Sequence, residues 1–240
     1  MLVAFYLFKR TCMQRNISTL LGNNVEATEG EIGTVKDFYF DDHTWTVRYM
    51  VVKTGGWLFG QEVLISPYAV LPHSWESGAF PVRLTKEQVR LSPDIDMEKP
   101  VSRGQEEGLA NYYSWQRYWK KGFFPGEREI LKETNEDPHL RSIQKIADCN
   151  ILASDGDIGL VSDIIMDDQN WQISYLVADL HNWIGGKKVL IAVNNIKDVN
   201  WKNSKVMVKI SMKAIKNSSA IDPWNYIVPE DGNALTHSLS

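Results

Sequence analysis

The sequence contains few of the residue types that catalytic and metal sites usually need. Its 240 residues include 2 cysteines and 5 histidines, and neither cysteine belongs to a Cys-x-x-Cys motif. A phosphate-binding glycine loop, a nucleophile elbow and a zinc-protease motif are also missing. From these absences we expect a protein that is not an enzyme and that has no catalytic residues, no cofactor and no metal site.

Strong positive charge and a membrane-spanning apolar run are missing too. The net charge is −4, so nucleic-acid binding would need a local basic patch. The apolar run that opens the chain covers residues 1–8, whereas a spanning helix needs about 20 residues. We therefore predict a cytoplasmic protein with reduced thiols. Residues 1–14 are expected to form an N-terminal leader, and either Met1 or Met13 is the start.

The most informative feature that is present is an internal repeat. Residues 15–96 align with residues 141–222 over 82 positions without a gap, and 24 of the aligned pairs are identical. A unit of this length is a domain, because solenoid and propeller repeats have periods of about 20 to 50 residues. The expected domains are residues 15–96 and 141–222, joined by a linker at 97–140 and followed by a tail at 223–240.

Each copy has the residue pattern of short β-strands. Residues 32–40 and 45–52 are rich in β-branched and aromatic side chains, and the turn formers at 41–44 between them predict a hairpin. The matching loop at 167–170 keeps the same turn chemistry. The fold class is predicted to be all-β, with two tandem small barrels. Further strands are expected at 61–66, 80–84, 187–192 and 205–210.

Several of these segments carry a resemblance to a known family. The run from Ile32 to Asp42, continued by Trp45–Val52, Gly56–Gly60 and Val63–Pro67, resembles the PRC-barrel family. That family includes the cytoplasmic domain of the photosynthetic reaction centre H subunit and the C-terminal domain of the ribosome maturation factor. With its doubled domain the chain resembles tandem-barrel bacterial proteins more closely than either of these two. The resemblance implies a PRC-type barrel in each copy.

What the resemblance implies about function is a non-catalytic binding or assembly module, acting as a scaffold or adaptor. A protein partner is expected. Two alternatives follow from the family: a peripheral subunit of a photosynthetic or electron-transfer membrane complex, and an RNA-processing or ribosome-assembly factor. The partner would then be a membrane complex, bound without a transmembrane segment, or RNA or the ribosome. Self-association is a further alternative.

The linker contains a predicted amphipathic helix over residues 105–121. Acidic residues at its start and lysines at its end match the helix dipole. Aromatic residues three and four positions apart share one helix face. We expect this face to pack as core between the two barrels, and a partner-binding patch or a base-stacking platform are the alternatives. The four candidate partner-binding residues are Tyr112, Trp115, Tyr118 and Trp119.

Lysines concentrate near the end of the second copy. There they form a candidate basic patch, which an RNA partner would use. The simpler interpretation is a solvated edge strand that lysines protect against aggregation. The patch consists of Lys202, Lys205, Lys209 and Lys213.

Residues that are identical in both copies give structural expectations. The paired tryptophans are expected in the barrel cores or between the barrels, since a large ring buries much apolar area. The acidic turns at 41–42 and 167–168 are expected to be solvated rather than metal-binding. Asp37 and Asp163 interrupt strands, so we expect each to bond a neighbouring backbone amide. The tryptophan pairs are Trp45 and Trp171, Trp57 and Trp183, and Trp75 and Trp201.

Overall fold

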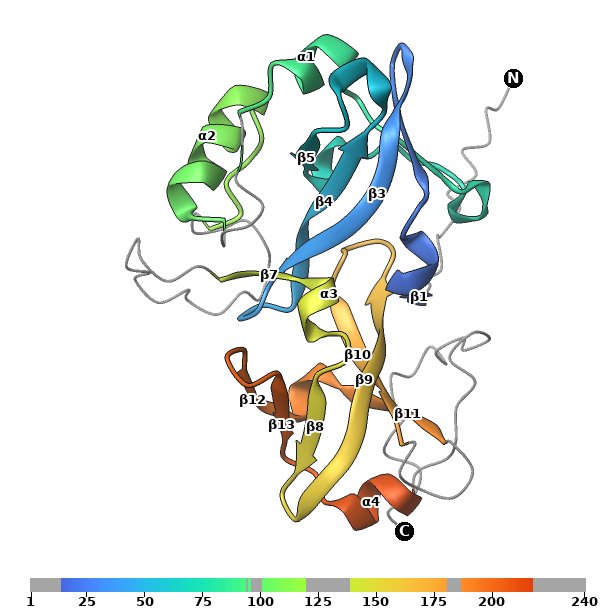
Figure 1. Cartoon of the computed structure of the whole chain (residues 1–240), viewed down its shortest axis with the longest axis vertical. Helices are drawn as coiled ribbons and strands as arrows, with labels where there is room; N and C mark the ends of the chain where they lie inside the picture. Colours follow the sequence, from blue (N-terminus) through green and yellow to red (C-terminus); the bar gives the residue numbers. More distant parts are fainter. Residues whose placement is uncertain (1–13, 94, 96–100, 120–138, 181–186, 218–240) are drawn as a thin grey trace, which may run out of the picture.

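The computed structural model describes residues 14–93, 95, 101–119, 139–180 and 187–217. Nearly all of the predicted leader, the whole tail at 223–240 and residues 120–138 of the linker lie outside the described residues. Figure 1 shows two β-sheets arranged along the long axis of the molecule, one in each repeat. The predicted all-β class is confirmed. We call residues 15–96 the first repeat and residues 141–222 the second repeat.

The sheet of the first repeat follows the order β5-β4-β3-β2-β6. Its long hairpin is the predicted one, and β2 pairs in parallel with β6. The strand pairings found among the described residues leave the sheet open and curled around its apolar side chains. Its strands are β2 (Asn24–Ala27), β3 (Gly30–Asp41), β4 (Thr46–Thr54), β5 (Glu62–Ile65) and β6 (Ala79–Pro81).

The sheet of the second repeat follows the equivalent order, β11-β10-β9-β8-β13-β12. β8 and β13 make the parallel pair that β2 and β6 make in the first repeat. The extra strand β12 corresponds to a single bridge, Val70 to Val82, in the first repeat. Its strands are β8 (Asn150–Ala153), β9 (Gly156–Asp167), β10 (Ile173–Asp179), β11 (Lys188–Ala192), β12 (Ile196–Asn200) and β13 (Lys205–Val208).

The two long hairpins turn in the same way because an aspartate side chain bonds the turn backbone. Asp41 accepts hydrogen bonds from the amides of His43 and Thr44, at 3.0 and 2.9 Å. Asp167 accepts the equivalent bonds from Gln169 and Asn170, at 2.8 and 3.2 Å. Such side-chain bonds stabilise a turn locally. The predicted hairpins and their turn chemistry are therefore confirmed.

Each repeat sends its first strand across to the other repeat. β1 (Gln14–Asn16) pairs with β9 of the second repeat, and β7 (Leu140–Ser142) pairs with β3 of the first repeat. The two strands occupy equivalent positions in the internal repeat. Figure 1 shows both near the middle of the molecule. The sequence analysis did not predict this exchange, since the pairing depends on residues more than a hundred positions apart.

An aspartate on each long strand holds the exchanged segment. Asp37 accepts a hydrogen bond from the hydroxyl of Ser142, and its other oxygen accepts one from the amide of Phe38 at 2.8 Å. Asp163 accepts the equivalent bonds from the side chain of Asn16 at 3.0 Å and from the amide of Ile164 at 2.7 Å. The predicted bonding of a neighbouring backbone amide is confirmed for both aspartates.

The tips of the two hairpins also meet as equivalents. The amide of Val47 donates to the carbonyl of Trp171 at 2.9 Å, and the amide of Ile173 donates to that of Trp45 at 2.7 Å. The equivalent residues Thr46 and Gln172 form a bridge between these bonds. Contacts in which residue i meets j and the equivalent of j meets that of i indicate a two-fold axis. An approximate two-fold axis therefore passes between the repeats, beside Thr46.

One hydrophobic core runs through both repeats. Phe38 and Phe80 of the first repeat are 0% and 1% exposed, and both rings face Trp171 of the second repeat, with centroids 6.3 and 6.1 Å away. Trp75 and Trp171 lie 5.5 Å apart, and Trp201 lies 6.2 Å from Phe40. These tryptophans pack between the repeats, as predicted.

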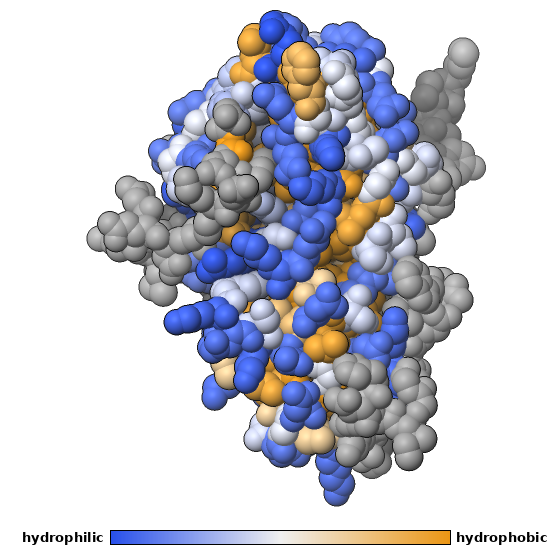
Figure 2. Space-filling view, viewed as in Figure 1, coloured by the Kyte–Doolittle hydropathy of each residue, from blue (hydrophilic) through white to orange (hydrophobic). Residues whose placement is uncertain are grey.

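The expected position of Trp57 in the core or between the barrels was wrong. Its side chain is 37% exposed, and its indole nitrogen donates to the carbonyl of Ile32 at 2.8 Å, so it lies at the surface rather than in the core. Its equivalent Trp183 lies outside the described residues. Figure 2 shows a mostly hydrophilic face with scattered apolar patches, in keeping with a core that faces inward.

The helices are short and lie around the sheets. Ser102 begins the longest one, α2, with a capping box in which its side chain and that of Gln105 each bond the other's backbone. None of the described helices is long and apolar enough to cross a membrane. The α-helices are α1 (Lys86–Arg90), α2 (Arg103–Tyr113), α3 (Ile143–Ile146) and α4 (Met212–Asn217). The 3-10 helices are η1 (Ile17–Leu20), η2 (Gly56–Leu58), η3 (Pro67–Ala69), η4 (Trp75–Ser77) and η5 (Val193–Asn195).

The aromatic helix is shorter than predicted and lies elsewhere. α2 ends at Tyr113, because Ser114 takes a left-handed conformation with φ 56° and the amide of Trp115 bonds back to Ala110 at 3.0 Å. Leu109 of α2 is fully buried against the outer face of the first sheet. Figure 1 places α2 beside that sheet, away from the second repeat. The expected packing between the barrels was therefore wrong for α2 itself, whereas Tyr113 and Trp115 at and beyond its end also pack against the core that both repeats share.

Candidate cavity at the junction of the repeats

Two equivalent polar clusters, which we call corners, lie on either side of the approximate two-fold axis. Each consists of an arginine, an aspartate and a tryptophan. At one corner, Arg15 of the exchanged strand bonds Asp168 at 3.2 Å and lies over the ring of Trp75, 5.7 Å from its centroid. At the other corner, Arg141 bonds Asp42 at 2.9 Å and lies 5.1 Å from the ring centroid of Trp201.

Contacts between the repeats therefore cover most of one aspartate side chain in each acidic turn. The side chains of Asp42 and Asp168 are 11% and 8% exposed. The expectation that these turns are solvated was wrong. A turn aspartate looks like a surface residue in the sequence, and only the docking of the other repeat covers it.

The corner at Asp168 opens into a cavity of about 950 Å³. Both repeats line it, and so does the segment that follows α2. Its walls include Thr46 and Tyr49 of β4, the loop after β5, and the hairpin tip up to Trp171. The volume lies within the range of about 300 to 1,000 Å³ that small-molecule sites occupy. Because the cavity needs both repeats, it exists only in the docked arrangement.

The charged residues that line the cavity are mostly arginines. They are Arg15, Arg48 and Arg83, with Asp168 as the one acidic residue among the lining residues. Arg48 is buried, with its guanidinium 3.8 Å from the ring centroid of Tyr118. A chain whose net charge is −4 thus surrounds this cavity with an excess of positive charge. An arginine guanidinium binds carboxylates and phosphates through paired hydrogen bonds.

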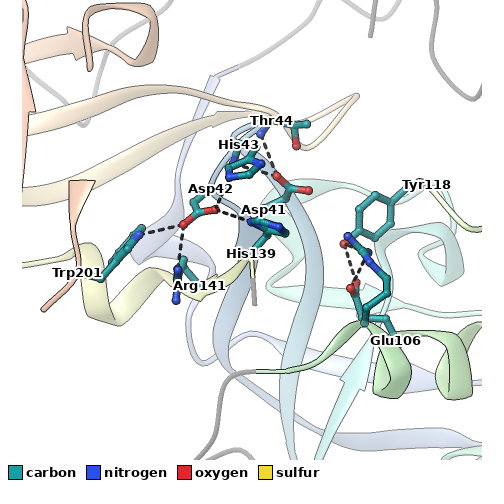
Figure 3. A network of polar contacts seen from close by, with 10 residues as sticks. Asp41, Asp42, His43, Thr44, Glu106, Tyr118, His139, Arg141 and Trp201 are labelled. Carbon is teal, nitrogen blue, oxygen red and sulfur yellow. Dashed lines mark hydrogen bonds and ion pairs between the residues drawn. The ribbon is translucent and has the colours of Figure 1, made fainter. Parts of the chain in front are cut away.

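A buried polar cluster supports the wall of the cavity at Tyr118. The phenol of Tyr118 donates to Glu106 at 2.6 Å (Figure 3), and Arg103 donates to the other carboxylate oxygen of Glu106 at 2.7 Å. Burial raises the pKa of Glu106 to about 7, against the opposing influence of Arg103. Burial also raises the pKa of Tyr118 well above its ordinary value. The cluster therefore fixes Tyr118 in place beneath Arg48.

The duplicated fold agrees with a comparison against known families. The family model of the PRC-barrel domain matches residues 13–89 and residues 139–214, which together exceed half of the chain. The chain belongs to the PRC-barrel domain family. A comparison with curated proteins finds no match. Each matched PRC-barrel segment contains one long hairpin and the strand that crosses to the other repeat.

Of the four candidate partner-binding aromatic residues, two lie at the cavity beside the first PRC-barrel repeat and two do not. Trp115 and Tyr118 line the cavity, whereas Tyr112 and Trp119 are not among its lining residues. Trp115 stacks on Tyr113 with centroids 4.2 Å apart. Tyr118 is 4% exposed, which leaves little of its ring for base stacking. Tyr112 is 39% exposed and donates its hydroxyl to the carbonyl of Gln88 in α1.

The candidate basic patch lies on the second PRC-barrel repeat, apart from the cavity lining. Lys202, Lys205, Lys209 and Lys213 are all exposed. The interpretation as an edge strand was wrong, because β13 lies between β8 and β12 and the edge belongs to β12. The role of the patch in binding stays a prediction.

Sequence reasoning missed the arginines and aspartates of the two corners. One signal could have found them. Arg15 and Arg141 are identical aligned residues, and so are Asp42 and Asp168. Charged residues that recur at both positions of a duplicated fold point to a shared contact between the copies. Arg83 aligns with Lys209, so in the alignment its positive charge looks like an ordinary surface feature.

Proposed function

We propose that this PRC-barrel protein is a non-catalytic binding module, and that the cavity at the repeat junction holds an acidic segment of a protein partner. The observation that carries the proposal is the cavity itself, which both repeats build and which arginines line. A cytoplasmic location is part of the proposal. An enzyme would need reacting groups in the cavity, and the proposal assigns none.

The chemistry of the lining supports an acidic partner. Arg48 and Arg83 contribute positive charge to the lining of the cavity, and Trp75, Trp115 and Trp171 contribute apolar surface. Tryptophan, tyrosine and arginine are the residue types that most often dominate binding energy at protein interfaces. A peptide with a carboxylate next to an apolar side chain matches both features.

The experiment is a pull-down from native lysate with the wild-type protein and two charge-reversed variants. Arg83→Glu reverses the charge at an exposed residue of the cavity lining, and Lys213→Glu makes the same change in the basic patch. Half of each lysate is treated with nuclease, and bound proteins are quantified by mass spectrometry. Thermal melting confirms that both variants are folded.

We expect Arg83→Glu to lower the recovery of a specific partner at least tenfold, and Lys213→Glu to leave it unchanged, with or without nuclease. Unchanged recovery with Arg83→Glu would contradict the proposed site. Ribosomal proteins that are lost with Lys213→Glu and with nuclease would favour the RNA alternative. Membrane-complex subunits that depend on Arg83 would identify the partner class of the other alternative.

A further inference from the structure

We propose that Asp42, His43 and His139 form a binding site for a divalent transition-metal ion, and zinc is the ion with which we would test it. One ligand atom from each residue lies within 4.8 Å of the other two. His43 Nε2 is 3.9 Å from Asp42 Oδ1, and His139 Nδ1 is 3.8 Å from the same oxygen. Figure 3 shows both rings turned toward this carboxylate.

Asp42 presents one oxygen to the two histidines because its other oxygen is already bound. Oδ2 accepts hydrogen bonds from Arg141 and from the indole of Trp201, both at 2.9 Å. Oδ1 is buried and has no hydrogen-bond partner. A buried carboxylate oxygen without such a bond is costly, and a bound cation would remove that cost. Arg141 and Trp201 would then act as the groups that orient a metal ligand.

The two rings are close enough to share an ion. Their centroids lie 4.0 Å apart. In a tetrahedral zinc site with bonds of about 2.1 Å, neighbouring ligand atoms are about 3.4 Å apart. The observed distances of 3.8 and 3.9 Å therefore need to close by roughly half an ångström. The side chain of His43 is 58% exposed, so it has room to make this movement.

The ligand types decide which ions fit. Imidazole nitrogens suit zinc, copper, iron and nickel, whereas magnesium and calcium prefer oxygen ligands. Three protein ligands leave a fourth position for water. The site also depends on the tertiary structure, because Trp201 of the second repeat holds Asp42 of the first. Metal binding is thus expected to stabilise the docked arrangement of the repeats.

The second repeat supplies an internal comparison. Asp168 is equivalent to Asp42, but His43 aligns with Gln169. His139 lies just ahead of the aligned region, and the residue 126 positions before it is Met13, so neither histidine recurs. Gln169 occupies the same hairpin turn, which shows that glutamine is compatible with this backbone. His43→Gln is accordingly a substitution that removes the ligand and keeps the turn.

The test uses the full-length protein without a histidine tag. Zinc binding is measured by isothermal titration calorimetry for the wild type, His43→Gln, His139→Gln and the control His73→Gln. The ring of His73 packs against Trp75 and Phe80 and is not part of the cluster. Cobalt absorption spectra report independently on the geometry around the ion. Melting with and without zinc shows whether each variant is folded and whether the ion stabilises it.

We expect one zinc ion per chain in the wild type and in His73→Gln, with affinity at least tenfold weaker in His43→Gln and His139→Gln. Cobalt should give tetrahedral bands that both of these variants lose. Zinc should raise the melting temperature of the wild type and not that of His43→Gln. The proposal is overturned if the wild type binds no zinc, or if folded His43→Gln binds zinc as tightly as the wild type does.

Discussion

Asp42 and Asp168 occupy equivalent turns in the two repeats, and each is bound by an equivalent arginine from an exchanged strand. Their surroundings differ. Asp42 also faces His43 and His139, whereas the turn of Asp168 has Gln169 and opens into the large cavity. The approximate two-fold axis thus preserves the contacts that hold the repeats together. The chemistry that surrounds those contacts is different on the two sides.

The same contrast holds on the outer faces of the sheets. In the first repeat, Tyr49, Val51 and Leu64 pack beneath Leu109 of α2. The equivalent residues Tyr175, Val177 and Leu190 form a cluster of their own in the second repeat, and α2 has no counterpart there among the described residues. Duplication supplied the framework, and the residues that diverged carry the two candidate sites.

The largest effect is expected from comparing the equivalent tryptophans Trp171 and Trp45. Trp171→Ala should lower the free energy of unfolding by about 3–5 kcal/mol, because Trp171 is 9% exposed and fills the core between the repeats. Trp45 is only partly buried and stacks on one ring, Phe40, so Trp45→Ala should cost about half as much. Denaturant unfolding measures both. Equal losses of unfolding free energy would contradict the prediction and would mean that the side-chain core follows the two-fold symmetry of the backbone.

The second prediction concerns Glu106 of α2, the linker helix that covers the sheet of the first repeat and has no counterpart on the second among the described residues. Its pKa in the folded protein is raised from 4.5 to about 7, so the folded state binds this proton more tightly than the unfolded state does. The resulting stability is fully present below about pH 4.5 and is lost as the pH rises through about 7. The glutamine in Glu106→Gln cannot ionise, so this variant should not lose stability in this way as the pH rises.

The measurement is the difference in unfolding free energy between wild type and Glu106→Gln across that pH range. The wild type should lose roughly 2–3 kcal/mol relative to the variant between pH 4.5 and pH 8. Groups that titrate in both proteins cancel in the difference. A difference that stays constant with pH would show that Glu106 keeps an ordinary pKa in its buried cluster.

The smallest effect is expected at the exchanged strands. Ser142→Ala removes the hydrogen bond to Asp37, whose pKa burial raises, and should cost about 1–3 kcal/mol. The equivalent change, Asn16→Ala, removes a bond to the more exposed Asp163 and should cost less than about 1 kcal/mol. Chemical unfolding of both variants tests the order. A larger loss for Asn16→Ala would reverse the inferred ranking of the two crossings.

Local patterns allowed much of the fold to be predicted. The long hairpins follow from β-branched and aromatic residues on both sides of an Asp-Asp turn, and Asp41 and Asp167 bond the turn backbone as such residues do. The end of α2 was not predictable in this way. Aromatic spacing favoured a helix to residue 121, but the contacts of Trp115 with Tyr49 and of Tyr118 with Glu106 prevailed over helix propensity.

The sequence by itself determined that this protein is a duplicated all-β PRC-barrel protein, because strand and turn preferences act over a few residues and recur after 126 positions. Only the tertiary structure decided that each repeat lends its first strand to the other. It also decided that Arg48 and Arg83 face one cavity and that His139 meets His43. Such contacts join residues far apart in the chain, so they depend on how the two repeats dock rather than on any local preference.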